Sequence, residues 1–308
     1  MRSALLWMAR NDWLQRTVPS WPFVRRAVRR FMPGEHVDDA FAAAERLRGD
    51  GIGVLFTRLG ENLTSLSEAD EVAAHYRQVL EQDAARDHLG RPVELSVKPT
   101  QLGLDLDAEA CLAHCHDLAT RCAERGTWLW LDMEGSDHTE ATVRLAEALM
   151  ADHDNVGLAL QAYLRRTAED IQRVLPHRPA IRLVKGAYEE PGTICYRAPA
   201  EVDANFLALA VLLAGPATRG EARLTLGTHD VGLVEQIRTI TEPMGLPTSA
   251  LEVHMLYGIR EDELRRLRDA GHPVSSLVAY GSAWYRWYMR RLAERPANVA
   301  FALRQLLP

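Results

Sequence analysis

A chain of 308 residues can fold as one large barrel or as two smaller domains. Its hydrophobic content of 47% and charged content of 25% are typical of soluble globular proteins, and a formal net charge of -6 argues against binding to nucleic acid. No stretch approaches the roughly 20 apolar residues of a membrane span. Four cysteines are too few for a disulfide scaffold, so we expect a cytoplasmic protein that is at most peripheral on the inner face of a membrane.

Residues 1–34 form a basic and aromatic segment with seven arginines and three tryptophans. An amphipathic helix of this composition is suited to lie on an anionic membrane surface, and it is also suited to pack as a cap on the domain that follows. The apolar run at residues 4–8 is too short for a secretory signal. We expect residues 1–48 to be an N-terminal helical segment and residues 49–308 to be a separate catalytic domain.

From about residue 50 onward, aliphatic or β-branched runs alternate with amphipathic segments of helical period, which is typical of strand–helix units around a parallel sheet. The predicted strands span residues 51–57, 93–100, 128–134, 156–162, 180–188, 223–230, 250–255 and 274–280. Helices are predicted over residues 68–80, 108–125, 139–151, 168–174, 200–213, 231–241, 261–270 and 283–294. Eight such units without a G-x-G-x-x-G loop predict one closed (β/α)8 barrel of the TIM type rather than a Rossmann fold.

Polar residues stand at the ends of most predicted strands, where a (β/α)8 barrel carries its active site. Alternation along a strand places Asp132 with Glu134 on one face, and Arg182 with Val184 and Gly186 on one face. Burying such groups is costly unless they pair or bind a ligand, so we expect them to form a site at the barrel mouth. The polar residues assigned to strand ends are Lys98, Asp132, Glu134, Gln161, Tyr163, Arg182, Lys185, Tyr188, Thr228, His229, Glu252 and His254.

Lys98 and Lys185 are the only two lysines among 36 basic residues. In a chain so rich in arginine, a retained lysine suggests a place where the planar guanidinium cannot replace a compact, rotatable ammonium. The last predicted helix adds Arg290, Arg291 and Glu294 beyond the eighth strand. If that helix tilts over the barrel mouth, the two arginines can hold one carboxylate and Glu294 can orient one of them.

Two alternatives use the same strand-end residues differently. A metal-dependent hydrolase would take its ligands from Asp132, Glu134, His229, Asp230 and His254. This alternative leaves the lysines and the arginine pair without a role, and the Cys111–His116 segment is better explained as helix packing, so we predict no metal site. The second alternative is a catalytically silent protein that binds an amino acid or a flavin.

The strand-end motifs, taken in order, resemble the proline dehydrogenase family, including the dehydrogenase domain of proline utilization A. The motifs that carry this resemblance are L-G-E-N, S-V-K-P-T, L-D-M-E, L-Q-A-Y, I-R-L-V-K-G-A-Y, G-T-H-D, E-V-H-M-L-Y-G-I-R and R-R-L-A-E-R-P, over about residues 50–296. The resemblance implies a distorted (β/α)8 barrel, with N-terminal helices and a C-terminal helix over the mouth, that holds FAD noncovalently. It also implies oxidation of L-proline to 1-pyrroline-5-carboxylate by hydride transfer to flavin N5.

The resemblance assigns the site residues position by position. Asp132 and Arg182 would be catalytic, with Arg182 near flavin N5. The implied flavin contacts are Met133, Gln161, Arg182, Val184, Lys185, Gly186, Ala187, Thr228, His229 and Glu252. The implied substrate-binding residues are Lys98, Tyr188, Leu277, Trp287, Arg290, Arg291 and Glu294.

The family also implies partners outside the chain. Electrons would pass to a membrane quinone, which gives the basic N-terminal segment a membrane-facing role, and a pyrroline-5-carboxylate dehydrogenase would act downstream. Leu277 and Trp287 stand where the family usually has tyrosines, so the alternative is the same chemistry on hydroxyproline or a larger ring. His254 replaces a glutamine that is common in the family.

Overall fold

The computed structural model describes residues 11–18, 21, 28–60, 63–86, 91–285 and 287–289. Its strands pair in parallel, each with the next along the chain and β8 with β1, so they close a barrel in the order β1 to β8. The strands are β1 Gly53–Arg58, β2 Glu94–Val97, β3 Leu129–Leu131, β4 Val156–Gln161, β5 Ala180–Val184, β6 Arg223–Gly227, β7 Leu251–Leu256 and β8 Val274–Tyr280. The predicted closed (β/α)8 barrel is confirmed.

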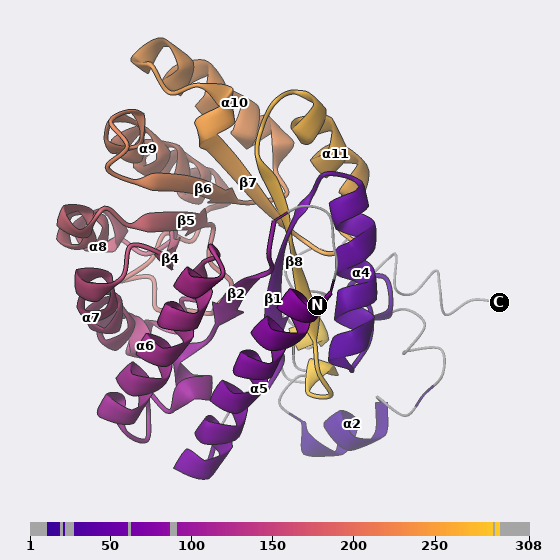
Figure 1. The fold of residues 1–308 in the computed structure, drawn as a ribbon. Coiled ribbons are helices and arrows are strands. Elements are labelled where there is room, and N and C mark those ends of the chain that lie inside the picture. Colours follow the sequence, from indigo (N-terminus) through magenta and orange to yellow (C-terminus); the bar gives the residue numbers. More distant parts are fainter. Residues whose placement is uncertain are drawn as a thin grey trace.

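Helices α5 to α11 surround the strands as the crossover connections of the barrel (Figure 1). The α-helices are α2 Asp12–Thr17, α4 Val37–Gly49, α5 Leu66–Ala85, α6 Ala108–Glu124, α7 Ser136–Asp152, α8 Thr167–Val174, α9 Pro199–Thr218, α10 Val231–Thr241 and α11 Glu261–Asp269. Short 3-10 helices are η2 Pro99–Leu102, η3 Leu175–His177, η4 Glu242–Met244 and η5 Thr248–Ala250. Of the last predicted helix, residues 284–285 and 287–289 are helical, and its remainder lies outside the described residues.

Five strands, β2 to β6, end earlier than the sequence pattern predicts, and β2 and β5 show the reasons most clearly. β2 ends at Val97, because Pro99 begins a 3-10 helix and lacks the N–H that a strand ladder needs. β5 ends at Val184, and Gly186 then adopts φ +112°, which lies outside the strand region. The polar residues that the sequence assigned to these strands therefore stand in loops at the barrel rim.

The strand register shows which side chains face the inside of the barrel. Partners across parallel strands point to the same face, and Arg182 pairs with Ala159 on one side and Thr225 on the other. Thr225 pairs in turn with Glu252 of β7, so Glu252 also faces the inside. Inward positions are therefore unusually polar, because a TIM barrel normally fills this space with branched aliphatic side chains.

The apolar core lies outside the barrel, between strands and helices. The outward positions of the strands are nearly all apolar, as Val54 and Phe56 in β1 and Ile181 and Leu183 in β5 illustrate. They pack against the inner faces of the helices in one large cluster. Burial of this area stabilises the barrel and leaves its interior available for polar groups.

Helix α9 is long and apolar enough to cross a membrane, by length and composition alone. The sequence expectation that no such stretch exists is therefore wrong. In the structure, α9 connects the parallel strands β5 and β6 and contacts both, together with α10. A crossover helix in this position belongs to the barrel wall, since closure of the sheet requires it there.

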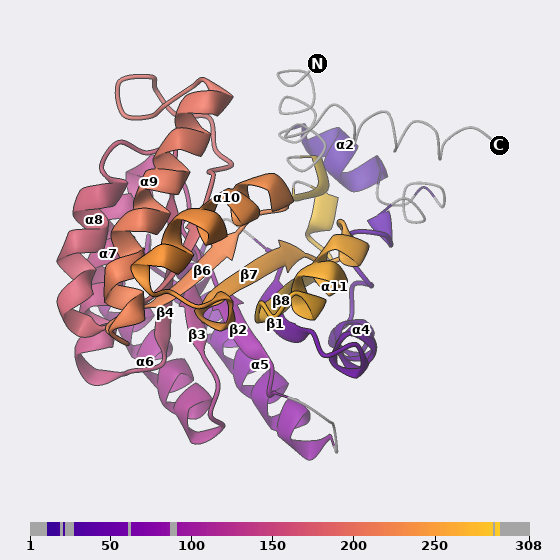
Figure 2. The same ribbon diagram turned by 90° about the horizontal axis from the view of Figure 1, so that it is seen from above.

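The described part of the N-terminal segment packs near the end of β8. Val28, Phe31 and Met32 form a second apolar cluster with residues 284–285 and 287–289, and Leu14 and Val18 at α2 pack against it. Figure 2 shows α2 beyond the end of the barrel, apart from the ring of helices. Helix α4 crosses the predicted domain boundary at residues 48/49 and packs directly on β1 and β8. The boundary itself stays a prediction.

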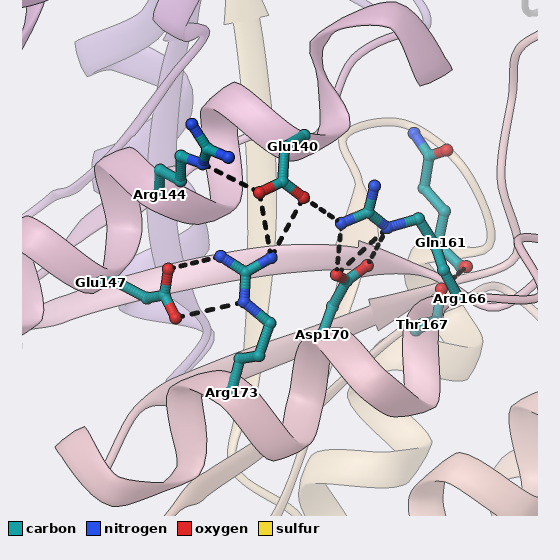
Figure 3. A network of polar contacts seen from close by, with 8 residues as sticks. All are labelled: Glu140, Arg144, Glu147, Gln161, Arg166, Thr167, Asp170 and Arg173. Carbon is teal, nitrogen blue, oxygen red and sulfur yellow. Dashed lines mark hydrogen bonds and ion pairs between the residues drawn. The ribbon is translucent and has the colours of Figure 1, made fainter.

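A charged network joins α7 to α8 and to the turn after β4 (Figure 3). Arg166 donates to both carboxylate oxygens of Asp170 and to Glu140, while Arg173 binds Glu140 and Glu147. The three arginines around Glu140 lower the pKa of this carboxyl to about 2, with Arg166 as the main cause. Thr167 also donates to the carbonyl of Gln161, so the network supports the end of β4.

Replacing Arg166 with alanine is expected to lower the free energy of unfolding by about 1–3 kcal/mol, because it leaves the side chain of Asp170, which is 2% exposed, without its partner. Arg144→Ala is the matched control, since Arg144 binds the same Glu140 but is 73% exposed, and its effect should stay within about 0.5 kcal/mol. Urea unfolding followed by circular dichroism measures both. Equal losses in the two variants would contradict this assignment.

Candidate active site

Residues from neighbouring strands meet at one rim of the barrel. Lys98 follows β2, Asp132 follows β3, Gln161 ends β4 and Lys185 follows β5. Because all strands are parallel, these carboxyl-terminal ends lie on the same side. Met133, Val184, Gly186, Ala187, Tyr188, Thr228 and His229 also stand at this rim, so the structure brings together most of the residues predicted for the site.

Arg182 is the central charge of this end of the barrel. It is 4% exposed, and its Nη2 donates to Ser96 Oγ at 2.9 Å and to Asp132 Oδ1. Ser96 Oγ donates in turn to the same Asp132 oxygen at 2.8 Å. Burial lowers the pKa of Arg182, and Asp132 acts against that shift, so the guanidinium stays charged. Its Nη1 is buried without a partner among the described residues.

Gln161 supplies a hydrogen-bond acceptor that complements the donor on Arg182. Its Nε2 donates to the carbonyl oxygens of Met133 and Glu134 at 3.2 and 3.0 Å. Its Oε1 is buried without a partner among the residues that the structure describes. Glu134 is fixed as well, since it accepts hydrogen bonds from the backbone N and Oγ1 of Thr100. A free donor on Arg182 and a free acceptor on Gln161 suit a polar ligand that carries both kinds of group.

Lys185 is held by two carboxylates. Its Nζ lies 2.5 Å from Asp203 Oδ1 of α9 and 3.0 Å from Asp230 Oδ2, while Asp230 Oδ1 caps α10 by accepting from Leu233 N. The next residue, Gly186, must be glycine, because a Cβ there would lie 2.2 Å from the ring of Tyr163. The K-G segment is therefore fixed in position at the rim.

His229 connects β6 to β7. The backbone N–H of Leu256 donates to His229 Nε2 at 3.0 Å, so this nitrogen is an acceptor, and Arg260 donates to the His229 carbonyl. Thr228 Oγ1 accepts from the backbone N–H of Asp230. No group of three or more histidine, cysteine, aspartate or glutamate side chains suited to a metal ion occurs in the described part of the chain.

Two residues predicted at the mouth lie elsewhere. Glu252 is the second residue of β7, which extends to Leu256, so it stands inside the barrel towards its amino-terminal end, whereas His254 stands midway along β7 and contacts the Trp130 ring. Glu252 accepts two hydrogen bonds from Arg223 and lies 3.0 Å from His254 Nε2. Although burial raises the pKa of Glu252, His254 and Arg223 hold it well below its usual range. Glu252 therefore stands below the strand end, and the predicted role of Glu252 in the site stays a prediction, as does that of His254.

The substrate-binding candidates divide into three groups. Lys98 is buried at the rim, and Tyr188 is half-buried in the loop after β5. Leu277 faces the barrel interior beside Leu55, whereas Trp287 is buried in the apolar cluster that includes Phe31. Arg290, Arg291 and Glu294 lie outside the described residues.

Several residues of the site were missed in the sequence. Ser96 and Trp130 stand two positions before Lys98 and Asp132, so strand alternation places them on the same inward face and could have identified them. Asp203 comes from a helix and carries no such signal. Glu190 is a further omission: it accepts from the backbone N and Oγ of Ser136 and joins the loop after β5 to the start of α7.

A cavity of about 440 Å³ opens at the opposite, amino-terminal end of the barrel. Its lining includes Arg91, Glu94, Trp128, Arg223 and Glu252. Because these residues precede or begin their strands, this cavity lies away from the rim that carries Asp132 and Lys185. In (β/α)8 enzymes the chemistry is located at the carboxyl-terminal end, so we place the active site at the rim.

A closed parallel barrel with a buried arginine–aspartate pair and a buried lysine at its mouth defines an enzyme of the (β/α)8 class. The model of the proline dehydrogenase family matches residues 40–304, and the chain belongs to this family. Proline dehydrogenase 1 of Bacillus subtilis strain 168 is 32% identical over 309 residues, which cover 100% of this chain and 99% of the relative. Proline dehydrogenase of Deinococcus radiodurans is 32% identical over 285 residues, covering 90% and 89%.

Solved structures show the same fold. A crystal structure of proline utilization A from Bdellovibrio bacteriovorus superposes with a TM-score of 0.81 at 22% identity, covering 95% of this chain and 38% of that chain. Proline utilization A from Bradyrhizobium japonicum gives a TM-score of 0.74 at 22% identity, covering 90% and 32%. The predicted family and the predicted class, an oxidoreductase that acts on proline, are confirmed.

Proposed function

We propose that this chain is an FAD-dependent proline dehydrogenase that oxidises L-proline to 1-pyrroline-5-carboxylate and passes the electrons to a quinone. The observation that carries the proposal is a pair of buried atoms at the barrel mouth, Arg182 Nη1 and Gln161 Oε1, that have no hydrogen-bond partner in the described part of the chain. A flavin ring has a polar edge with both hydrogen-bond acceptors and a donor. The residues present therefore fit this cofactor.

The proposed flavin contacts at the rim are those that the sequence assigned, without Glu252. Arg182 would donate to the cofactor through Nη1, and Gln161 would accept through Oε1. Lys185 would hold a polar group of the cofactor by an ammonium that Asp203 and Asp230 already fix in place. The remaining candidates are Met133, Val184, Gly186, Ala187, Thr228 and His229. When bound, FAD supplies the hydride acceptor at its N5, and this chemistry belongs to the cofactor.

The protein's own task is to bind and orient the substrate. Oxidation removes a hydride from the ring carbon next to nitrogen and a proton from the nitrogen, leaving a cyclic imine. Lys98, together with Arg290 and Arg291, would bind the carboxylate, and Glu294 would orient one of these arginines. Asp132 holds Arg182 by an ion pair, which fixes the guanidinium at the rim.

The ring proposed for the substrate is unsubstituted proline. Leu277 presents an apolar side chain to the barrel interior, and a hydroxyl placed against it would lose its hydrogen bonds to water. Hydroxyproline is therefore expected to be a poorer substrate than L-proline. Leu277 replaces the tyrosine that is usual in the family, and leucine cannot form a hydrogen bond with a ring hydroxyl.

The purified protein should be yellow, and anaerobic L-proline should bleach its visible absorption. Hydroxyproline should bleach it at least about tenfold more slowly, which corresponds to one unpaired hydroxyl. Stopped-flow spectrophotometry measures both rates, with D-proline as the control. A colourless protein that binds no added FAD would sink the proposal.

Lys98→Arg and Lys185→Arg should separate substrate binding from cofactor binding. Lys98→Arg should raise the KM for L-proline by about tenfold and leave the flavin content unchanged, because a bulky guanidinium replaces the compact ammonium. Lys185→Arg should instead raise the dissociation constant for FAD. Flavin fluorescence and steady-state kinetics measure the two effects. The reverse pattern would contradict this division of roles.

We also propose that the protein is cytoplasmic and peripheral on the inner face of the membrane, with a pyrroline-5-carboxylate dehydrogenase consuming its product. The basic N-terminal segment supports this location, since its Trp13 and Trp21 are 65% and 38% exposed. Co-sedimentation with anionic vesicles should be lost when residues 1–34 are deleted. Unchanged co-sedimentation would remove the membrane role from this segment.

A further inference from the structure

Trp130 lies in the barrel interior between two guanidinium groups. Its side chain is fully buried, and the ring centroid lies 4.9 Å from Arg182 Cζ and 5.2 Å from Arg223 Cζ. Space for the indole comes from Gly157 on β4, where a Cβ would lie 2.4 Å from the Trp130 ring. A tryptophan in this place is therefore built into two neighbouring strands.

A hydrogen bond and an aromatic contact fix the orientation of the Trp130 indole. Its Nε1 donates to Glu94 Oε2 at 2.5 Å, and Glu94 Oε1 accepts from Arg223 Nη2 at 3.0 Å. The imidazole of His254 approaches edge-on, with ring centroids 5.5 Å apart and an interplanar angle of 73°. Rotation of the ring would break the hydrogen bond to Glu94 and separate both cations from its face.

Arg182 thus contacts both the Trp130 ring and the Asp132–Ser96 pair. Its Nη2 is held by Ser96 and Asp132, and its Nη1 has no partner among the described residues. An ion pair alone would let the Arg182 guanidinium rotate about the contact with Asp132, whereas the stacked Trp130 ring fixes the guanidinium plane. Trp130 and Asp132 thus hold Arg182 in one orientation from adjacent inward positions of the same chain segment.

We propose that Trp130 is a positioning residue that sets the reduction potential of the flavin through Arg182. This inference rests on the proposed function, since it requires FAD at the mouth. A cation held at a fixed place beside a flavin stabilises its electron-rich reduced form and raises the potential. If the ring is removed, the guanidinium of Arg182 can turn about its contact with Asp132 and away from the flavin, and the potential falls.

Packing alone makes a different prediction. If Trp130 only fills space, its replacement lowers stability and leaves the potential of the bound flavin unchanged. Trp128 provides a matched control, because its ring lies 4.6 Å from Arg223 Cζ and is part of the same interior cluster, but it makes no contact with Arg182 in the described structure.

The test measures the midpoint potential of FAD in the purified holoenzyme by dye-coupled reduction, beside thermal unfolding. Trp130→Leu should shift the potential to a more negative value and slow anaerobic flavin reduction by L-proline about tenfold, with its dissociation constant for proline within about twofold of the original. Trp128→Leu should lower the unfolding temperature and keep the original potential.

Trp130→Phe guards against misfolding of the leucine variant. It retains an aromatic face of weaker cation affinity and loses the bond to Glu94, so its potential should shift in the same direction by a smaller amount. An unchanged potential in Trp130→Phe and in any folded Trp130→Leu would overturn the inference while the proposed function stands. An original protein that binds no FAD would overturn both.

Discussion

The burial of Arg182 inside a parallel barrel is the constraint on which the rest of the site depends. A guanidinium that is 4% exposed is stable only when carboxylates, hydroxyls or aromatic faces replace its water. Asp132, Ser96 and Trp130 provide these groups. Because Trp130 is too large for an ordinary barrel layer, Gly157 is needed opposite it. The polar interior, Gly157 and the Arg182–Asp132 ion pair therefore depend on one another.

The same constraint explains why the apolar core lies outside the sheet. Strand residues alternate between the two faces, so the inward set can be polar only if the outward set supplies the hydrophobic stabilisation. This is why the sequence pattern predicted eight strands correctly: the outward aliphatic residues were enough to identify each one. The strand ends were less predictable, because Pro99 and Gly186 terminate β2 and β5 for local backbone reasons that hydropathy does not include.

The placement of Glu252 and His254 could not be predicted from the same pattern. In β7 the inward residues are polar and the outward residues apolar along nearly the whole strand, so alternation identifies the face but not the depth. Depth depends on the register with β6 and β8, which is a long-range property. Asp203 illustrates the same limit, since its contact with Lys185 joins a helix to a strand end. The rim residues next to Gly, Pro and charged motifs were accessible to sequence reasoning because turns mark them.

The charge balance of the barrel interior bears on the proposed binding of an anionic substrate group. Arg182 and Arg223 face the three carboxylates of Asp132, Glu94 and Glu252, while burial lowers the pKa of His254 and favours its neutral form. The interior alone therefore carries a small negative excess that buried Lys98 offsets. A substrate carboxylate adds another negative charge in a place of low dielectric, where an unbalanced charge is costly. This balance supports the proposed binding of the substrate carboxylate by Arg290 and Arg291, which are two further cations of the sequence.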